Sequence, residues 1–247
     1  MIGSVSATPR VLVVIPAWNE SGSVATVIGE VIAVLPSADV LVVDDGSRDA
    51  TADLARAAGA TVARLPFNLG VGGAMRTGFR YARAEGYEVV VQVDADGQHD
   101  AAGIPQLIDR LEQADLVVGA RFSGVGEYRV RGPRRWAMGV LSMTLSAIAG
   151  HRLVDTTSGF RASGPRAIEV FAQHYPAEYL GDTVEALVIA ARSGLVIDQV
   201  PVAMRVRFAG QPSSSPLRAA GYLARAVLAL IFAVLRPRSL YRIGVSR

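Results

Sequence analysis

Two aspartates in the segment AspAlaAspGlyGlnHis, at residues 94–99, have the types and the spacing of a divalent-cation site. They directly follow an apolar run at 89–93, which predicts a buried strand. The chain turns where a strand ends, so Asp94 and Asp96 can approach one point, and two carboxylates would repel a phosphate ligand unless a cation lay between them. Oxygen ligands of this kind select Mg²⁺ or Mn²⁺, and Gln98 can add a neutral oxygen. We therefore predict a metal site at Asp94, Asp96 and Gln98; the alternative is a solvated loop.

Polar residues also follow two other apolar runs. ProAlaTrpAsnGlu at 16–20 follows the run at 11–15, and AspAspGlySer at 44–47 follows the run at 40–43. Ligands of open parallel sheets bind beyond the carboxyl ends of the strands, so we expect these two segments and residues 94–99 to converge on one crevice.

The residues of the first two segments suit a nucleoside. Asp44 or Asp45 could accept hydrogen bonds from a nucleobase or ribose. Asn19 and Glu20 lie opposite these acids, at the end of the first run, and Trp18 offers a flat face for stacking. For AspAspGlySer, turn chemistry gives the alternative of an Asx turn that caps the next helix.

A glycine-rich segment, AsnLeuGlyValGlyGlyAla at 68–74, resembles a phosphate cradle at a helix N-terminus. It lacks the lysine of a P-loop and the spacing of the dinucleotide fingerprint, so a flexible start of the helix that carries Arg76 is an equal alternative. His99, His151 and His174 do not have the spacing of a metal site, and we interpret the last two as structural. Nothing indicates a Ser-His-Asp triad.

The pattern of short Val-rich runs alternating with helix-like stretches predicts a doubly wound α/β fold, in which helices cover both faces of a mostly parallel sheet. Further strands are expected near 116–118, 196–200 and 202–206. Helices are expected at 24–35, at 51–58 behind an Asp49 cap, and at 73–85, 104–113, 166–173 and 178–192.

The composition excludes several kinds of chemistry. The 247 residues are 51% apolar and 19% charged, enough to bury one large core and too apolar for intrinsic disorder. The absence of cysteine excludes disulfides, thiolate nucleophiles and cysteine-bound metal clusters. All 25 Lys and Arg residues are arginine, which also removes a pyridoxal Schiff base, a lysine general base and the Walker A lysine.

Positive charge gathers toward the C-terminal end. Eight arginines and no acid follow Asp198, while the net charge is only +3, so a uniformly basic surface for nucleic acid is not expected. A second group of arginines lies just before a charge-free stretch at 136–150 and is suited to bind a lipid phosphate, unless it is a solvated loop. Its members are Arg129, Arg131, Arg134 and Arg135.

Two apolar segments, at 136–150 and 217–235, bear on membrane contact. Neither reaches the ~20 uninterrupted apolar residues that cross a bilayer, so each is interpreted as a helix in the membrane interface or as a buried core helix. Residues 1–9 lack the basic and apolar regions of a signal peptide. We therefore expect a peripheral protein at the cytoplasmic face of the cell membrane.

Six motifs, taken together in their order and spacing, resemble those of family 2 glycosyltransferases with the GT-A fold, most closely the dolichyl- or polyprenyl-phosphate mannosyltransferase branch. Besides the four segments above they include GlyAlaArg at 119–121 and SerGlyPheArg at 158–161. The resemblance covers about residues 11–215. It implies a GT-A domain over 1–215 and leaves 216–247 as a membrane-associating helix and basic tail.

The resemblance implies a nucleotide-sugar donor. The family residues that contact its nucleoside correspond to Pro16, Trp18 (usually a tyrosine), Glu20, Val43 and Asp45.

The same resemblance places the sugar diphosphate against Asp94, Ala95 and Asp96, with Asp96 and Gln98 on Mg²⁺ or Mn²⁺. Arg121 matches an arginine near the diphosphate and the acceptor, and Arg207 matches the arginine of a later flexible loop.

After that arginine the sequence departs from the family. It reads Gly210, Gln211, Pro212, Ser213 where the family often has Gly, an acid, Ser and Lys, so one phosphate contact is missing.

The chemistry of the acceptor decides whether a general base is needed. A phosphate monoester is already an anionic nucleophile near neutral pH because its second pKa is about 6. We therefore favour transfer of a hexose, mannose or glucose, to polyprenyl phosphate, and the resemblance implies that the transfer inverts the sugar. The four clustered arginines and Arg121 would bind the acceptor, and Asp94, Asp96, Arg121 and Arg207 would serve catalysis.

Two alternatives remain from the sequence. Transfer to a sugar hydroxyl of a cell-envelope glycan would need a base, for which Asp182 or Glu185 is the candidate; otherwise these are a helix-start acid and a salt-bridge partner. The other alternative is an inactive nucleotide-sugar-binding scaffold. The motifs allow a homo-oligomer or a membrane-protein partner without specifying either.

Overall fold

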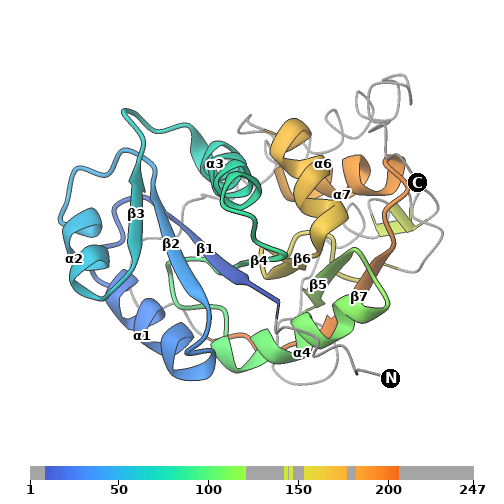
Figure 1. The fold of residues 1–247 in the computed structure, drawn as a ribbon, viewed down its shortest axis with the longest axis horizontal. Coiled ribbons are helices and arrows are strands. Elements are labelled where there is room, and N and C mark those ends of the chain that lie inside the picture. The colour runs from blue at the N-terminus through green and yellow to red at the C-terminus, as the bar shows by residue number, and fades with distance from the viewer. Residues whose placement is uncertain (1–8, 121–141, 144, 147–152, 177–181, 206–247) are drawn as a thin grey trace, which may run out of the picture.

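A computed structural model describes residues 9–120, 142–143, 145–146, 153–176 and 182–205. These residues contain a seven-stranded sheet in the order β3-β2-β1-β4-β6-β5-β7 (Figure 1). The strands are β1 (Val11–Ala17), β2 (Asp39–Asp44), β3 (Thr61–Arg64), β4 (Val89–Gln92), β5 (Leu116–Ala120), β6 (Arg161–Ser163) and β7 (Ile197–Pro201).

The pairing of the strands fixes where the polar segments meet. β1 lies between β2 and β4 and is parallel to both, so their carboxyl ends lie at one edge of the sheet. β6 is antiparallel to both β4 and β5. Arg161, the first residue of β6, therefore pairs with Gln92, the last residue of β4, and residues just before β6 lie beside the end of β4. The expected convergence of the three strand ends is confirmed.

Helices cover both faces of the sheet (Figure 1). One layer holds α1 (Val24–Val34), α2 (Thr51–Ala57) and α4 (Ile104–Asp109), which is followed by a 3₁₀ turn (Arg110–Glu112). The other holds α3 (Gly70–Ala84), α6 (Pro165–His174) and α7 (Asp182–Arg192).

Alternation along the strands supplies one core to each layer. In β1, Val11, Val13 and Ile15 pack toward α1 and α4, whereas Leu12 and Val14 pack toward α3 and α6. The predicted doubly wound α/β class, with a mostly parallel sheet, is confirmed.

Several local predictions need correction. The strand predicted at 202–206 is not present in its described part, where Met204 forms only an isolated bridge with His99. β3 and β6 were not predicted, since a four-residue strand and a three-residue strand give too little periodicity to recognise. The helix predicted at 73–85 begins three residues earlier, and the one predicted at 104–113 is α-helical only to Asp109.

No helix in the described parts of the chain is both long enough and apolar enough to cross a bilayer. The predicted interface helix at 217–235, the predicted boundary between 215 and 216, and most of the stretch 136–150 lie outside the described residues.

Candidate active site

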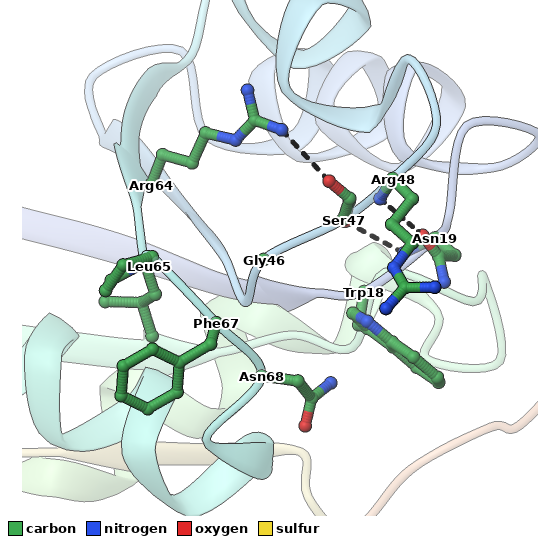
Figure 2. Close-up of a pocket in the computed structure, with 10 residues that line it drawn as sticks. Trp18, Asn19, Gly46, Ser47, Arg48, Arg64, Leu65, Phe67 and Asn68 are labelled. Carbon is green, nitrogen blue, oxygen red and sulfur yellow. Dashed lines mark hydrogen bonds between the residues drawn. The ribbon is translucent and has the colours of Figure 1, made fainter.

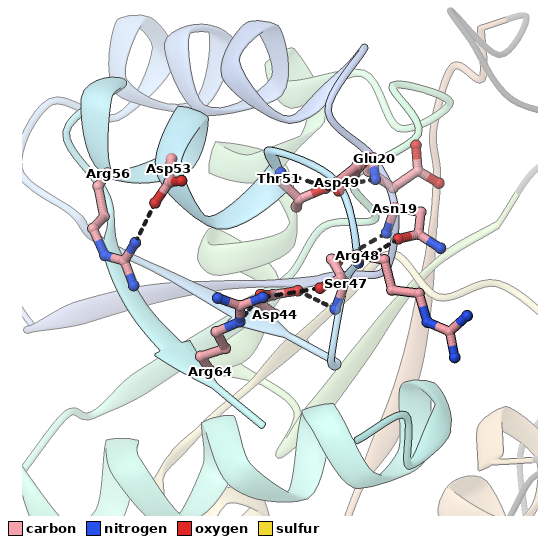
Figure 3. Close-up of polar contacts among 10 residues, drawn as sticks. All are labelled: Asn19, Glu20, Asp44, Ser47, Arg48, Asp49, Thr51, Asp53, Arg56 and Arg64. Carbon is pink, nitrogen blue, oxygen red and sulfur yellow. Dashed lines mark hydrogen bonds and ion pairs between the residues drawn. The ribbon is translucent and has the colours of Figure 1, made fainter. Parts of the chain in front are cut away.

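Hydrogen bonds join the loop after β1 to the loop after β2 and to the first residue of α2 (Figure 3). The backbone N–H of Asn19 donates to Ser47 Oγ at 2.9 Å, and the N–H of Arg48 donates to Asn19 Oδ1 at 2.9 Å. The N–H of Glu20 donates to Thr51 Oγ1 at 2.8 Å. Asn19 holds a φ of 54°, a left-handed conformation that asparagine tolerates better than most residues. The polar residues after β1 and β2 thus form one connected unit.

Asp49 closes the same unit at the start of α2. Its Oδ1 accepts the N–H of Thr51 at 3.1 Å, and its Oδ2 accepts the N–H of Ser21 at 3.1 Å. Burial alone would raise the pKa of Asp49, but the hydrogen bonds from Thr51 and Ser21 outweigh it and hold the pKa below its usual value. The residue at the N-cap position is Ala50, so Asp49 acts one residue earlier than a formal cap.

Asp44 is fully buried and serves the turn. Its Oδ1 accepts the N–H of Ser47 at 2.9 Å, and its Oδ2 lies 3.1 Å from Arg64 Nε. Arg64 also donates to the backbone oxygen of Ser47 at 3.0 Å. Asp44 is therefore a residue of the turn, as the alternative interpretation expected, but it does not cap α2 and does not reach the crevice.

Asp45 joins the end of β2 to the start of α3. Its two oxygens accept the backbone N–H groups of Leu69 and Gly70, each at 2.7 Å. Burial raises the pKa of Asp45, an effect that these hydrogen bonds partly offset and that the neighbouring Asp44 strengthens. Two N–H groups of the glycine-rich segment are thus bound by a carboxylate, which favours the helix-start interpretation of that segment over a phosphate cradle.

A pocket of about 900 Å³ opens between these loops at the carboxyl ends of β1, β2 and β3 (Figure 2). Two exposed aromatic side chains flank it, Trp18 at 54% exposure and Phe67 at 62%. Among the residues that the structure describes, its lining contains two arginines and no acid: Trp18, Asn19, Gly46, Ser47, Arg48, Arg64, Leu65, Pro66, Phe67 and Asn68. A planar group with hydrogen-bond acceptors at its edge suits such a lining.

Of this lining, the sequence pointed to Trp18 and missed Phe67 and Arg48. Phe67 follows β3, and because that strand was not recognised, the loop after it was not counted among the strand ends. The available signal was an aromatic residue directly before AsnLeuGly in a polar turn.

The AspAlaAsp motif begins at Asp94, two residues after the last residue of β4, which ends one residue earlier than predicted. The Asp94 side chain is 37% exposed, whereas Asp96 is 6% exposed and its Oδ1 accepts the N–H of Gln98 at 3.0 Å.

The donor set of this motif fits a hard cation. No three His, Asp or Glu side chains in the described residues form a cluster that could enclose a metal. Mg²⁺ is commonly held by one or two carboxylates together with substrate phosphates, and Asp94 and Asp96 can supply these carboxylates.

Three other predicted donor residues lie in the sheet or next to it. Pro16 of β1 pairs with Val43 of β2, and the side chains of Pro16, Val43 and Ala95 are buried. Val43 belongs to the core under α3, so its side chain is not directed to the crevice. Glu20 is half-buried and accepts a hydrogen bond from Ser23 Oγ at 2.8 Å.

The predicted arginines of the diphosphate and acceptor sites fall outside the described residues: Arg121, Arg129, Arg131, Arg134, Arg135 and Arg207. Asp182 and Glu185, the candidate bases for a hydroxyl acceptor, lie in the first turn of α7.

The sheet order, the strand-end pocket and the AspAlaAsp motif together define a glycosyltransferase of the GT-A class. Residues 12–171 match the model of glycosyl transferase family 2, and the chain belongs to this family.

Two named relatives extend the comparison. The chain is 35% identical over 216 residues to undecaprenyl-phosphate mannosyltransferase of Micrococcus luteus, covering 83% of this chain and 88% of that protein. It is 33% identical over 174 residues to polyprenol monophosphomannose synthase of Mycolicibacterium smegmatis, covering 67% of this chain and 66% of that protein.

Solved structures share the fold at lower identity. Glucosyl-3-phosphoglycerate synthase of Mycobacterium tuberculosis in complex with UDP superposes with a TM-score of 0.71 at 22% identity, covering 93% of this chain and 81% of that one. The same enzyme with Mn²⁺, UDP-glucose and phosphoglyceric acid gives a TM-score of 0.70 at 21% identity, with the same coverage.

Proposed function

We propose that this protein transfers a hexose, mannose or glucose, from a nucleotide-diphosphate sugar to polyprenyl phosphate. The observation that carries the proposal is the single edge of the sheet at which an aromatic and cationic pocket and the AspAlaAsp motif both lie. The two relatives described above, named for transfer to polyprenyl phosphates, support the lipid acceptor.

In this proposal the donor extends along the edge of the sheet. Its base stacks on Trp18 or Phe67 and presents acceptor atoms to Arg48, and its diphosphate reaches the loop after β4. Asp96 and Gln98 would hold Mg²⁺ or Mn²⁺, which when bound neutralises charge on the diphosphate, and Asp94 faces the sugar.

The acceptor phosphate needs no general base, because it is already ionised near neutral pH. Its oxygen attacks the anomeric carbon of the sugar, the bond from that carbon to the diphosphate oxygen breaks, and the nucleoside diphosphate leaves. Attack opposite the leaving group inverts the anomeric configuration. Arg121, the cluster at Arg129, Arg131, Arg134 and Arg135, and Arg207 remain our proposed partners of the phosphates.

We also propose that the protein acts at the cytoplasmic face of the membrane, where a polyprenyl phosphate presents its headgroup. This rests on the arginine-rich and apolar C-terminal composition and on the lipid substrates in the relatives' names.

The test is a transfer assay with purified protein, Mg²⁺ or Mn²⁺ and labelled UDP-, GDP- and dTDP-sugars. With polyprenyl phosphate one donor should give a lipid-soluble product, and with polyprenol, which lacks the phosphate, it should not. Asp96→Asn should remove turnover. No product from any donor would refute the proposal.

A matched variant separates the phosphate from a hydroxyl acceptor. Asp182→Asn should retain near-normal turnover, since no base is required. A loss of several orders of magnitude would instead indicate a hydroxyl acceptor that depends on Asp182.

A further inference from the structure

His99 is a buried histidine whose ring faces a single residue of the site. It is 3% exposed and stacks on Phe160 with ring centroids 5.0 Å apart and planes inclined by 15°. Its Nδ1 accepts the backbone N–H of Asp94 at 3.0 Å, and its Nε2 lies 3.6 Å from Asp94 Oδ2. Both nitrogens of the ring are therefore directed at Asp94.

The hydrogen bond at Nδ1 determines where the neutral ring carries its proton. A nitrogen that accepts an N–H is unprotonated, so the hydrogen lies on Nε2, the nitrogen nearer the carboxylate. A separation of 3.6 Å is too long for a direct hydrogen bond, but it presents the positive edge of the ring to the negative oxygen.

Two further residues confine the Asp94 carboxylate. Gln92 Nε2 donates to Oδ1 at 3.3 Å. Gly159 lies against both side chains, since an added Cβ there would be 3.0 Å from Asp94 Oδ2, 3.1 Å from Oδ1 and 3.1 Å from Gln92 Nε2. The antiparallel course of β6 brings Gly159 to this position, because the start of β6 lies beside the end of β4. The carboxylate thus has polar contacts with His99 and Gln92, packs against a glycine, and remains partly exposed.

The backbone around His99 is also anchored. His99 forms an isolated antiparallel bridge with Met204, and Gln98 O accepts the N–H of Arg205 at 2.9 Å. The guanidinium of Arg205 donates to Glu30 on α1 at 2.7 Å and to Asp100 at 2.8 Å. These contacts fix the loop that carries the imidazole as well as the ring itself.

We propose that His99 is a positioning residue that holds the Asp94 carboxylate in one orientation toward the sugar of the bound donor. The inference rests on the proposed function, in which Asp94 faces the donor. His99 acts only through Asp94: it removes the need to order that side chain when the sugar binds, which is a recognised source of rate enhancement.

The first test compares two replacements of His99. His99→Phe keeps a ring against Phe160 but has no acceptor for the N–H of Asp94, whereas the Oδ1 of His99→Asn can take the place of Nδ1. We expect kcat to fall about 10- to 100-fold in His99→Phe, as for other residues that orient a functional group, and to recover in large part in His99→Asn. His174→Phe, at the end of α6, controls for the loss of an imidazole elsewhere and should leave kcat unchanged.

The second test is calorimetric binding of UDP, GDP, UDP-glucose and GDP-mannose with Mn²⁺ and no acceptor. If His99 acts on the sugar contact, His99→Phe weakens binding of the nucleotide sugar and leaves binding of the matching nucleoside diphosphate unchanged. No lipid is present in this experiment, so its result does not depend on whether the acceptor is polyprenyl phosphate. The identity of the acceptor is tested separately by the transfer assay.

A double-mutant cycle tests action through Asp94. Once Asp94→Ala has removed the carboxylate, adding His99→Phe should cause no further loss of kcat. Additive losses, or equal weakening of nucleotide sugar and nucleoside diphosphate without recovery in His99→Asn, would overturn the proposal. If His99→Phe does not fold, His99→Gln replaces it. The glutamine amide reaches the Nε2 position and leaves no acceptor at the Nδ1 position, where the N–H of Asp94 is bound. A kcat of His99→Gln as high as that of His99→Asn would also overturn the proposal.

Discussion

The carboxylate of Asp45 accepts the backbone N–H of Gly70 at 2.7 Å, which ties the end of β2 to the first residue of α3. Its other oxygen binds the N–H of Leu69 at the same distance. A motif residue expected to contact the nucleoside therefore also fixes the loop that carries Phe67 and Asn68 into the pocket. Shape and binding at this edge of the sheet depend on the same side chain.

Asp45→Asn should lower the free energy of unfolding by about 1–3 kcal/mol. An amide offers one oxygen where the carboxylate offers two, so its NH₂ group faces one of the two backbone N–H donors. Urea denaturation measures the change. Asp53→Asn, in an exposed pair with Arg56, is the control and should stay within about 0.5 kcal/mol of the wild type. Equal effects of the two variants would show that the hydrogen bonds of Asp45 do not stabilise the fold.

Asp45 and Asp49 should affect the pH dependence of stability with opposite signs. The pKa of Asp45 is raised in the folded protein, so the folded state binds the proton of this carboxyl more tightly than the unfolded state does. The resulting gain in the free energy of unfolding is present below the ordinary pKa of 3.8 and is lost as pH rises through the pKa of the folded state. The lowered pKa of Asp49 gives a contribution present above 3.8 that is lost as pH falls through the folded value.

Urea denaturation across the acidic range, for the wild type, Asp45→Asn and Asp49→Asn, checks these signs. On acidification the stability of the wild type relative to Asp45→Asn should rise, and its stability relative to Asp49→Asn should fall. The same direction for both variants would contradict the assignment.

Gly46→Ala should destabilise the protein more than an alanine at a comparable glycine elsewhere. Gly46 has a φ of 73°, and an added Cβ would lie 2.8 Å from the backbone carbon of Phe67. Gly86 has a φ of 72° with nothing within 4 Å of the added Cβ, so Gly86→Ala measures the left-handed conformation alone, about 1–2 kcal/mol. Gly46→Ala should cost a further 1–3 kcal/mol or so from overpacking. Similar losses of unfolding free energy in the two variants would mean that the loop after β3 moves to accommodate the added Cβ at little cost.

The sequence was informative where a strand is long and buried and where polar residues follow it directly. The Val-rich runs of β1, β2 and β4 predicted a parallel sheet, and parallel pairing brings strand ends to one edge, so the location of the site followed from topology. β6 could not be predicted in this way. Its three residues pair with strands on both sides, and only that pairing shows that Gly159 lies beside Asp94.

The roles of single acids were harder to predict than their location. Asp44 and Asp45 are adjacent, but one carboxylate is directed at Arg64 and the other at the start of α3. His99 was considered in the sequence only as a metal ligand, for which its spacing is wrong, and this gave no reason to expect its contact with Asp94. Side-chain direction at a strand end depends on the turn that follows, and sequence periodicity does not specify that turn.

At least one of the variants Trp18→Ala and Phe67→Ala should weaken binding of the matching nucleoside diphosphate. Stacking of a base on an aromatic side chain contributes about 1–3 kcal/mol by alanine substitution, and both side chains are more than half exposed beside the pocket. Calorimetry with UDP and GDP measures the loss. Leu54→Ala removes a 37% exposed apolar side chain from α2, outside the pocket lining, and should leave affinity unchanged. Unchanged affinity in both aromatic variants would exclude this pocket as the base site.

Arg205→Ala should lower the free energy of unfolding by about 1–3 kcal/mol, between the values for exposed and for buried ion pairs. Arg205 bridges Glu30 and Asp100, and the three side chains are 36%, 28% and 24% exposed. Arg56, whose pair with Asp53 at 2.8 Å has side chains 51% and 85% exposed, is the matched control, and Arg56→Ala should cost under about 1 kcal/mol.

Arg205→Lys should recover only part of the loss, because one ammonium group cannot reproduce the guanidinium fork between two carboxylates. Amide hydrogen exchange then reports where the stability is lost. Faster exchange at residues 98–100 and around Glu30 of α1, with the core of β1 unchanged, is expected if Arg205 anchors the loop next to Asp94. Uniformly faster exchange would show that Arg205 stabilises the whole domain and not this loop in particular.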